Sequence, residues 1–205
     1  MSALHRLAAF VLAFEMPVPF YWLVLHGGVE FWRKRPRAGY LCAVLIAWGI
    51  GDSLLFHFRA QLFRNPLIAS SAGSSAPPVW AIVAGLLLIA ADVILLTTVE
   101  MELGGHRLVG HAELTGTGEM TANSLYAWVR HPRYLGMILA VFGACLLGAS
   151  AQLWIAAALW LLVALATIPL EERELRLRFG PAYIAYAQRV PALLPLRARR
   201  ADNRP

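Results

Sequence analysis

The sequence predicts an all-α fold: an integral-membrane helical bundle of about five transmembrane helices, with a C-terminal helical hairpin and short cytoplasmic helices. Three observations predict it. Hydrophobic residues make up 59% of the 205 residues and charged residues only 15%, against a usual charged share of about 25%. The apolar residues form long runs, near the ~20 residues that cross a bilayer. The basic residues stand in short clusters between those runs, as membrane topology requires.

The composition also excludes several classes of protein. So apolar a chain is not disordered, and too few polar residues remain for a large soluble domain. The net charge of +6 does not indicate nucleic-acid binding, because the charge is dispersed between apolar runs. Cys42 and Cys145 lie inside apolar runs, which favours buried thiols over a disulfide or zinc site. We expect a single membrane domain over 1–205, with three spans in 1–99 and a cofactor-binding hairpin and C-terminal helices in 100–205.

Three apolar runs precede residue 100. The first contains Glu15, Pro17 and Pro19, so we expect a helix that is broken near its middle; we interpret it as a retained span and not as a cleaved signal peptide. A polar loop is expected between the second and third runs. The three runs and the loop are Leu7–Leu25, Tyr40–Phe58, Val79–Val99 and Asn65–Pro78.

Two further runs, Pro132–Gly148 and Ala151–Pro169, are separated by two residues and predict a tight antiparallel helical hairpin. Small residues recur every fourth position in the first of them and form one stripe, which allows close helix approach; they are Gly136, Ala140, Ala144 and Gly148. After Pro169 the chain becomes polar. There we expect two short helices, Glu171–Phe179 and Pro181–Arg189, and then a loose basic tail from Arg197.

The basic residues also predict the orientation of the chain. With five spans and an outside N-terminus, 15 of the 18 Lys and Arg residues fall on the inner side. Positive residues concentrate on the cytoplasmic side of membrane proteins. We therefore expect a cytoplasmic C-terminus, in what the arginine-rich composition suggests is a bacterial inner membrane.

Two polar segments flank the hairpin and carry the candidate chemistry. Arg130, His131 and Pro132 precede its first helix, whose N-terminal backbone N–H groups can hold a carboxylate or another anion. The alternative is that Arg130, Arg133 and Tyr134 only anchor the helix at lipid headgroups.

Glu171, Glu172 and Glu174 follow the second helix. At helical spacing Glu172 pairs with Arg176 and Glu174 with Arg178, whereas Glu171 has no cation at that spacing. We therefore expect Glu171 to be the freer acid. Because the hairpin returns the chain to its starting side, both segments should lie together at one cytoplasmic membrane face. Cations, backbone donors, carboxylates and aromatic rings there suit a zwitterionic ligand.

Other polar residues are weaker candidates. Glu15, Asp52 and Asp92 lie within spans, where acids are costly and often functional; a proton or ion path and helix pairing both remain open. The spacing of His106 and His111 with Glu102 and Glu113 matches no helical pair of metal ligands, so we expect no metal.

Taken together, the motifs resemble the isoprenylcysteine carboxyl methyltransferase and phospholipid methyltransferase superfamily. The resemblance rests on Arg-His-Pro-x-Tyr-x-Gly at 130–136, the hairpin, Glu171-Glu172-x-x-Leu175, and Phe179-Gly180-x-x-Tyr183-x-x-Tyr186 followed by Val190. It covers roughly Ser124–Pro195. It implies an integral-membrane methyltransferase that uses S-adenosylmethionine, bound at the cytoplasmic end of the hairpin.

The resemblance implies roles for individual residues. His131, Pro132, Tyr134 and Gly136 would shape the cofactor pocket, and Glu171 or Glu172 would receive the cofactor's amino group. Tyr183 and Tyr186 would close the pocket, and Tyr126 would contribute to it. Arg130 and Glu171 are the candidate catalytic residues.

The resemblance leaves the methyl acceptor open between an isoprenylcysteine-type carboxylate, a phospholipid amine and a thiol. The family often has an arginine where Ala192 stands, which favours a neutral or thiol-bearing acceptor. We expect a lipophilic or small-molecule acceptor that is reached from the lipid bilayer, and no nucleic-acid partner. The sequence does not indicate the oligomeric state. The alternative function is a small transporter or a non-catalytic membrane scaffold, suggested by the intramembrane acids.

Overall fold

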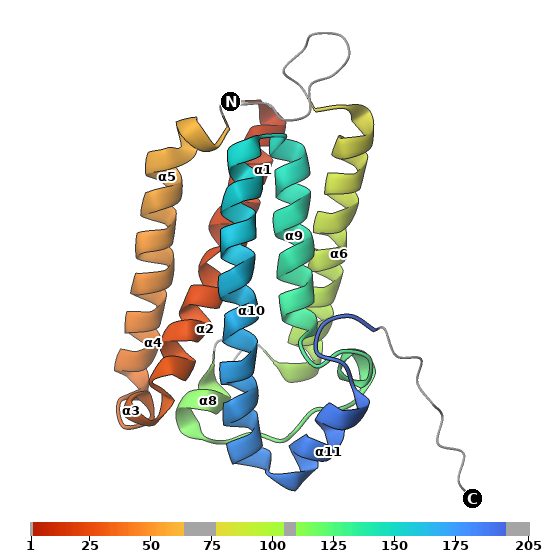
Figure 1. Ribbon diagram of the computed structural model, residues 1–205. Helices are drawn as coiled ribbons and strands as arrows, with labels where there is room; N and C mark the ends of the chain where they lie inside the picture. The colour runs from red at the N-terminus through yellow and green to blue at the C-terminus, as the bar shows by residue number, and fades with distance from the viewer. Residues whose placement is uncertain (1, 64–76, 105–109, 196–205) are drawn as a thin grey trace, which may run out of the picture.

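The computed structural model of the chain describes residues 2–63, 77–104 and 110–195. Within those ranges it contains helices and no β-strand, which confirms the predicted all-α class. The long helical segments of these ranges run alternately up and down the bundle (Figure 1). Three expectations fall wholly or largely outside the described residues: the loop at 65–76, His106, and the basic tail from Arg197.

The first pass consists of α1 (Ala3–Glu15) and α2 (Pro17–Gly27). The predicted break is present, because α1 ends at Glu15 and a new helix begins at Pro17. A proline suits a first helical position, where its missing N–H is not needed. The Ser2 hydroxyl caps α1 by accepting a hydrogen bond from the His5 backbone N–H at 3.2 Å.

The second pass is longer than predicted. A short helix, α3 (Val29–Arg33), precedes α4 (Pro36–Val44), which continues through a π-helical turn at Leu45–Ile50 into α5 (Gly51–Leu62). A π-helical turn widens the helix locally, and such turns are frequent at functional sites.

The third pass, α6 (Val79–Leu103), packs closely on α9 (Pro132–Gly148). The two helix backbones approach closely at Gly85 and Gly143: a Cβ on Gly143 would lie 2.6 Å from the Gly85 carbonyl oxygen. Gly136, from the predicted stripe, also faces α6, where a Cβ would lie 2.5 Å from Asp92. Gly148, at the other end of that stripe, faces Leu153 across the hairpin turn. The small residues of α9 therefore serve α6 as well as the hairpin.

The predicted hairpin is confirmed. Between α9 and α10 (Ala151–Phe179), Ala149 adopts a left-handed conformation with φ of 49°. Its backbone N–H bonds to the Cys145 carbonyl at 2.8 Å and ends α9.

The expected break after Pro169 was wrong. Helix α10 runs without interruption to Phe179, with Pro169 inside it. An internal proline removes one helical hydrogen bond and strains the preceding turn. Packing of the part of α10 before Pro169 against α1 and α2 offsets this cost. Trp160 donates to the Met16 carbonyl at 2.9 Å, and Thr167 donates to the Pro19 carbonyl at 3.4 Å. The predicted boundary at Gly180 is confirmed, since α11 (Pro181–Arg189) begins directly after it.

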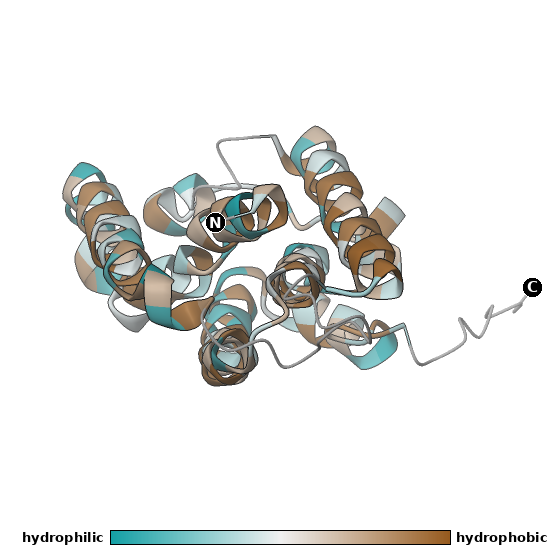
Figure 2. Ribbon diagram, turned by 90° about the horizontal axis from the view of Figure 1, so that it is seen from above, coloured by the Kyte–Doolittle hydropathy of each residue, from teal (hydrophilic) through white to brown (hydrophobic). Residues whose placement is uncertain are grey.

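Among the described residues, four passes are long and apolar enough to cross a bilayer: Ala3–Gly27, Pro36–Leu62, Val79–Leu103 and Ala151–Phe179. The fifth, α9, has 17 residues, which is at the short end of the range for a transmembrane helix. Figure 2, which views the bundle from above, shows hydrophobic residues along the long helices, interspersed with polar ones. The chain is thus an integral-membrane helical bundle.

The polar elements gather at one end of the bundle. The short helices α3, α8 (His111–Thr115) and α11 all lie at the end where α9 begins and α10 finishes (Figure 1). A 3₁₀ turn at Ser124–Ala127 precedes α9. The segments that flank the hairpin therefore meet there, as the sequence predicts.

Candidate active site

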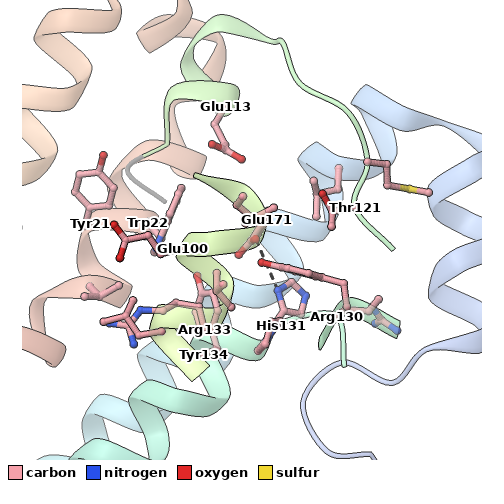
Figure 3. A pocket seen from close by; sticks show the side chains of 18 of the residues that line it. Tyr21, Trp22, Glu100, Glu113, Thr121, Arg130, His131, Arg133, Tyr134 and Glu171 are labelled. Carbon is pink, nitrogen blue, oxygen red and sulfur yellow. Dashed lines mark ion pairs between the residues drawn. The ribbon is translucent and has the colours of Figure 1, made fainter. Parts of the chain in front are cut away.

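A cavity of about 470 Å³ lies at this end of the bundle. One part of its wall is polar and comes from α8, the start of α9, the end of α10, and α11. The other part is apolar and aromatic and comes from the first three passes. Figure 3 shows the polar side chains converging on the space between these parts. One cavity therefore offers both a polar and an apolar compartment.

The start of α9 forms one corner of the cavity. His131 precedes the helix, Pro132 is its first residue, and the first helical hydrogen bond runs from the Leu135 N–H to the His131 carbonyl at 3.1 Å. The segment after α11 supports this corner from outside. The backbone N–H groups of Arg130 and His131 donate to Pro191 and Ala192 at 2.9 and 3.0 Å. His131, Pro132 and Tyr134 all line the cavity.

His131 links the two predicted segments. Its Nδ1 lies 3.7 Å from Oε1 of Glu171, and its Nε2 lies 3.2 Å from Oε1 of Glu172; Figure 3 marks the pair with Glu171. Burial lowers the pKa of the His131 imidazole, but the two carboxylates outweigh that effect and raise this pKa to about 9. This shift favours the imidazolium form, in which Nε2–H is within hydrogen-bond distance of Glu172 and Nδ1 forms an ion pair with Glu171.

Arg130 joins α9 to α10 and α11. Its guanidinium donates to Glu172 from Nε at 2.9 Å and from Nη2 at 2.5 Å. It also donates to the carbonyls of Ala187, at 2.9 Å, and Val190. Although Arg130 lines the cavity, its hydrogen bonds go to the protein, so its geometry fits a positioning role better than the catalytic role that we expected.

The two adjacent glutamates face different partners. Glu172 binds Arg130, His131 and Arg176, the last at the expected i,i+4 spacing and 2.9 Å, and it is not among the described residues that line the cavity. Glu171 does line the cavity, and its Oε2 is buried with no hydrogen-bond partner among the described residues. A buried carboxylate oxygen without a donor is costly unless a ligand supplies one.

Three predicted tyrosines surround the cavity on the α11 side. Tyr126, Tyr183 and Tyr186 all line it, and the Tyr186 hydroxyl donates to the Tyr126 carbonyl at 2.7 Å. Two predicted site residues, Glu172 and Gly136, are not among the described residues that line the cavity. Gly136 lies one turn into α9, against Asp92 of α6. Its close packing leaves no room for contact with a ligand in the cavity.

Sequence reasoning missed the apolar compartment and two carboxylates. The aromatic wall includes Tyr21, Trp22 and Trp48, and the acids are Glu100 and Glu113. The aromatic residues come from apolar runs that predict only membrane spans. Glu113 carried one signal, its position in a polar segment between two spans, and we had considered it only as a metal ligand.

Two of the three acids within the spans, Glu15 and Asp92, share one partner. Arg133 at the base of the cavity lies 2.5 Å from Oε2 of Glu15 and 3.0 Å from Oδ1 of Asp92. These contacts join α1, α6 and α9, so Glu15 and Asp92 pair helices, one of the two alternatives considered from the sequence. Asp52 is separate from this cluster, and its Oδ1 has no partner among the described residues.

Fold and cavity together define an integral-membrane helical protein with a candidate polar ligand site at one end of the bundle. Comparison with known proteins identifies its family: the sequence profile of the phospholipid methyltransferase family matches residues 80–182, and the chain belongs to that family. It is similar to methanethiol S-methyltransferase 1 of Bradyrhizobium diazoefficiens, with 36% identity over 104 residues. That match covers 44% of this chain and 36% of the relative, so it spans little more than a third of the relative's length. No solved structure matches the chain.

Proposed function

We propose that this protein is a membrane methyltransferase that transfers a methyl group from S-adenosylmethionine to a small or lipophilic acceptor. The observation that carries the proposal is the two-part cavity, in which a polar corner with an unpartnered Glu171 oxygen adjoins an aromatic compartment. Membership of the phospholipid methyltransferase family supports the reaction class. A transporter or scaffold has no comparable support.

The polar corner fits the amino-acid part of S-adenosylmethionine. Oε2 of Glu171 would accept a hydrogen bond from the ammonium group. The first backbone N–H groups of α9 have no helical partner and, with the positive end of the helix dipole, would hold the carboxylate. Protonated His131 keeps Glu171 in place through the 3.7 Å contact. Tyr183 and Tyr186 would cover this part of the cavity.

The bound donor would supply an activated methyl group on a positively charged sulfur. The work left to the protein is to align the acceptor with that methyl group and to exclude water. The aromatic side chains Tyr21, Trp22 and Trp48 would hold an apolar acceptor. Arg130 fixes the segment that closes the cavity, because it ties Glu172 to the carbonyls of α11.

The charges around the cavity favour an uncharged acceptor. Of the described residues that line it, three are arginines, and each is already paired. Arg130 binds Glu172, Arg133 binds Glu15 and Asp92, and Arg178 lies 3.4 Å from Glu113 and 3.6 Å from Glu174. A carboxylate acceptor would therefore lack a free cation. We propose a thiol, in line with the name of the similar methanethiol S-methyltransferase.

A methyl-transfer assay tests this function. We expect detergent-purified protein with labelled S-adenosylmethionine to label a small alkanethiol in preference to a prenylcysteine analogue or phosphatidylethanolamine. Preferred labelling of the prenylcysteine analogue would contradict the acceptor proposal and leave the methyltransferase standing. If no acceptor of any class is labelled and S-adenosylmethionine does not bind, the methyltransferase proposal itself is wrong.

We also propose that the protein lies in a bacterial inner membrane and that its cavity faces the cytoplasm. The support is the concentration of 15 of the 18 basic residues on that side of a five-span chain, which follows the positive-inside rule. Reporter fusions at Pro205 and near Ser74 should give opposite signals, cytoplasmic at Pro205. The same signal at both positions would contradict the five-span topology.

A further inference from the structure

Glu113 occupies an unusual position for an acid. It lies on α8, which covers the cavity, and its side chain points from there toward Glu171 (Figure 3). Glu113 is 9% exposed and lines the cavity. Oε1 lies 3.4 Å from Arg178, whereas Oε2 is buried and has no hydrogen-bond partner among the described residues. One oxygen is therefore anchored and the other is available to a ligand.

The surroundings of Glu113 are mixed in charge. Arg178 and Glu174 come from α10, as does Glu171 across the cavity, and Arg33 of α3 donates to the Glu113 backbone carbonyl at 2.9 Å. Tyr21 and Tyr134 face it from α2 and α9. Burial raises the pKa of the Glu113 carboxyl to about 7, with Glu171 and Glu174 adding to the rise and Arg178 opposing it.

A thiol acceptor requires a base that can accept its proton. The thiolate is the nucleophile, and even a cysteine thiol, with a pKa of about 8.5, is mostly protonated at neutral pH; a simple alkanethiol is a weaker acid still. An apolar compartment disfavours the thiolate further, because burial penalises the charged form. A base inside the cavity, with a pKa near the working pH, is the efficient remedy.

We propose that Glu113 is the general base that removes the proton of the methyl acceptor. This inference rests on the proposed function and adds a catalytic residue to it. The cavity holds two further acids, Glu100 and Glu171. Glu171 is engaged by His131 and assigned to the cofactor's ammonium group, whereas Glu113 combines burial, an unpartnered oxygen and a place on the cover of the cavity.

Proton removal from the thiol precedes attack on the donor methyl group. The S–H bond of the thiol breaks, its proton goes to Oε2 of Glu113, and its electron pair stays on sulfur. The sulfur then forms a bond to the donor methyl carbon, while the bond between that carbon and the donor sulfur breaks. The electron pair of the broken bond neutralises the donor's positive charge. Glu113 later releases its proton to water.

Two acceptors of different acidity test the role of Glu113. Butanethiol needs a base at pH 7, whereas 4-nitrothiophenol is already ionised. We expect Glu113→Gln to lower methyl transfer to butanethiol by about 10²- to 10⁴-fold, the usual contribution of a general base, and transfer to 4-nitrothiophenol by less than about tenfold. With butanethiol, the wild-type rate should rise with pH through about 7, because the base must be deprotonated. Glu113→Gln should lack that rise.

Equal losses with both thiols, or full activity of Glu113→Gln with butanethiol, would overturn the proposal. So would a loss of S-adenosylmethionine affinity in Glu113→Gln, since that places the carboxylate on the cofactor. Glu30→Gln, an exposed acid on α3, is the matched control and should behave as wild type. Glu113→Asp, which keeps the carboxylate, should recover part of the butanethiol activity if the charge itself matters.

A measurement without turnover completes the test. Infrared difference spectra of the protein alone, between pH 5 and 9, should contain a protonated-carboxyl band that titrates near pH 7 and is absent from Glu113→Gln. Absence of that band from the wild type would overturn the proposal. Failure of the proposed function has a different signature, because the wild type would then transfer no methyl group to either thiol.

Discussion

Replacing Arg133 by methionine is expected to destabilise the bundle by roughly 3–5 kcal/mol, the cost of breaking a buried ion pair by removing one partner. Arg133 is the cation that Glu15 and Asp92 share, at 2.5 and 3.0 Å. Glu15 is 2% exposed and Asp92 4%, so neither acid can turn to water. Methionine fills much of the same volume without charge. Thermal and denaturant unfolding in detergent measure the loss.

The charge interpretation has its own control. Adding Glu15→Gln and Asp92→Asn to Arg133→Met removes the stranded carboxylates, and we expect this triple variant to recover much of the lost stability. Arg37→Met, at an exposed arginine on α4, should change stability by less than about 0.5 kcal/mol. If the triple variant is no more stable than Arg133→Met, the loss comes from packing and not from uncompensated charge.

Most of the fold was predictable because the bilayer restricts what a chain can do. Apolar runs of the right length have to be helices that cross it, and two residues between Gly148 and Ala151 leave no alternative to a hairpin. The prediction failed at Pro169, where local propensity indicates a break. Contacts such as Trp160 with Met16 keep the helix intact, and these contacts join segments 144 residues apart in sequence.

The polar half of the candidate site could also be predicted from the sequence. A hairpin returns the chain to its starting level, so the segments containing His131 and Glu171 had to meet. The apolar half of the site could not be predicted from the sequence. A periodic apolar run indicates a span without indicating its neighbours, so nothing marked Tyr21 or Trp48 as cavity residues. The sequence does not mark Glu113 as a cavity residue either, because only the tertiary fold brings α8 to the cavity wall.

The polar corner makes a quantitative prediction about cofactor binding. Glu171→Gln and His131→Ala should each weaken S-adenosylmethionine binding by roughly 10- to 150-fold, which corresponds to the loss of a charged hydrogen bond of about 1.5–3 kcal/mol. Glu171→Gln removes the charge that would hold the ammonium group. His131→Ala acts indirectly, because it removes the imidazolium that lies 3.7 Å from Glu171. Isothermal titration calorimetry in detergent measures both affinities.

A variant of the neighbouring acid, Glu172, distinguishes a role in cofactor binding from a role in stabilising the fold. Glu172 is engaged by Arg130, His131 and Arg176, so Glu172→Gln should lower the unfolding temperature more than Glu171→Gln does. It should also affect affinity less, in protein that remains folded. The opposite pattern would assign the ammonium group to Glu172. Wild-type affinity in both Glu171→Gln and His131→Ala would reject this corner as the cofactor site, because each variant removes a group that is assigned to binding or orienting the ammonium group.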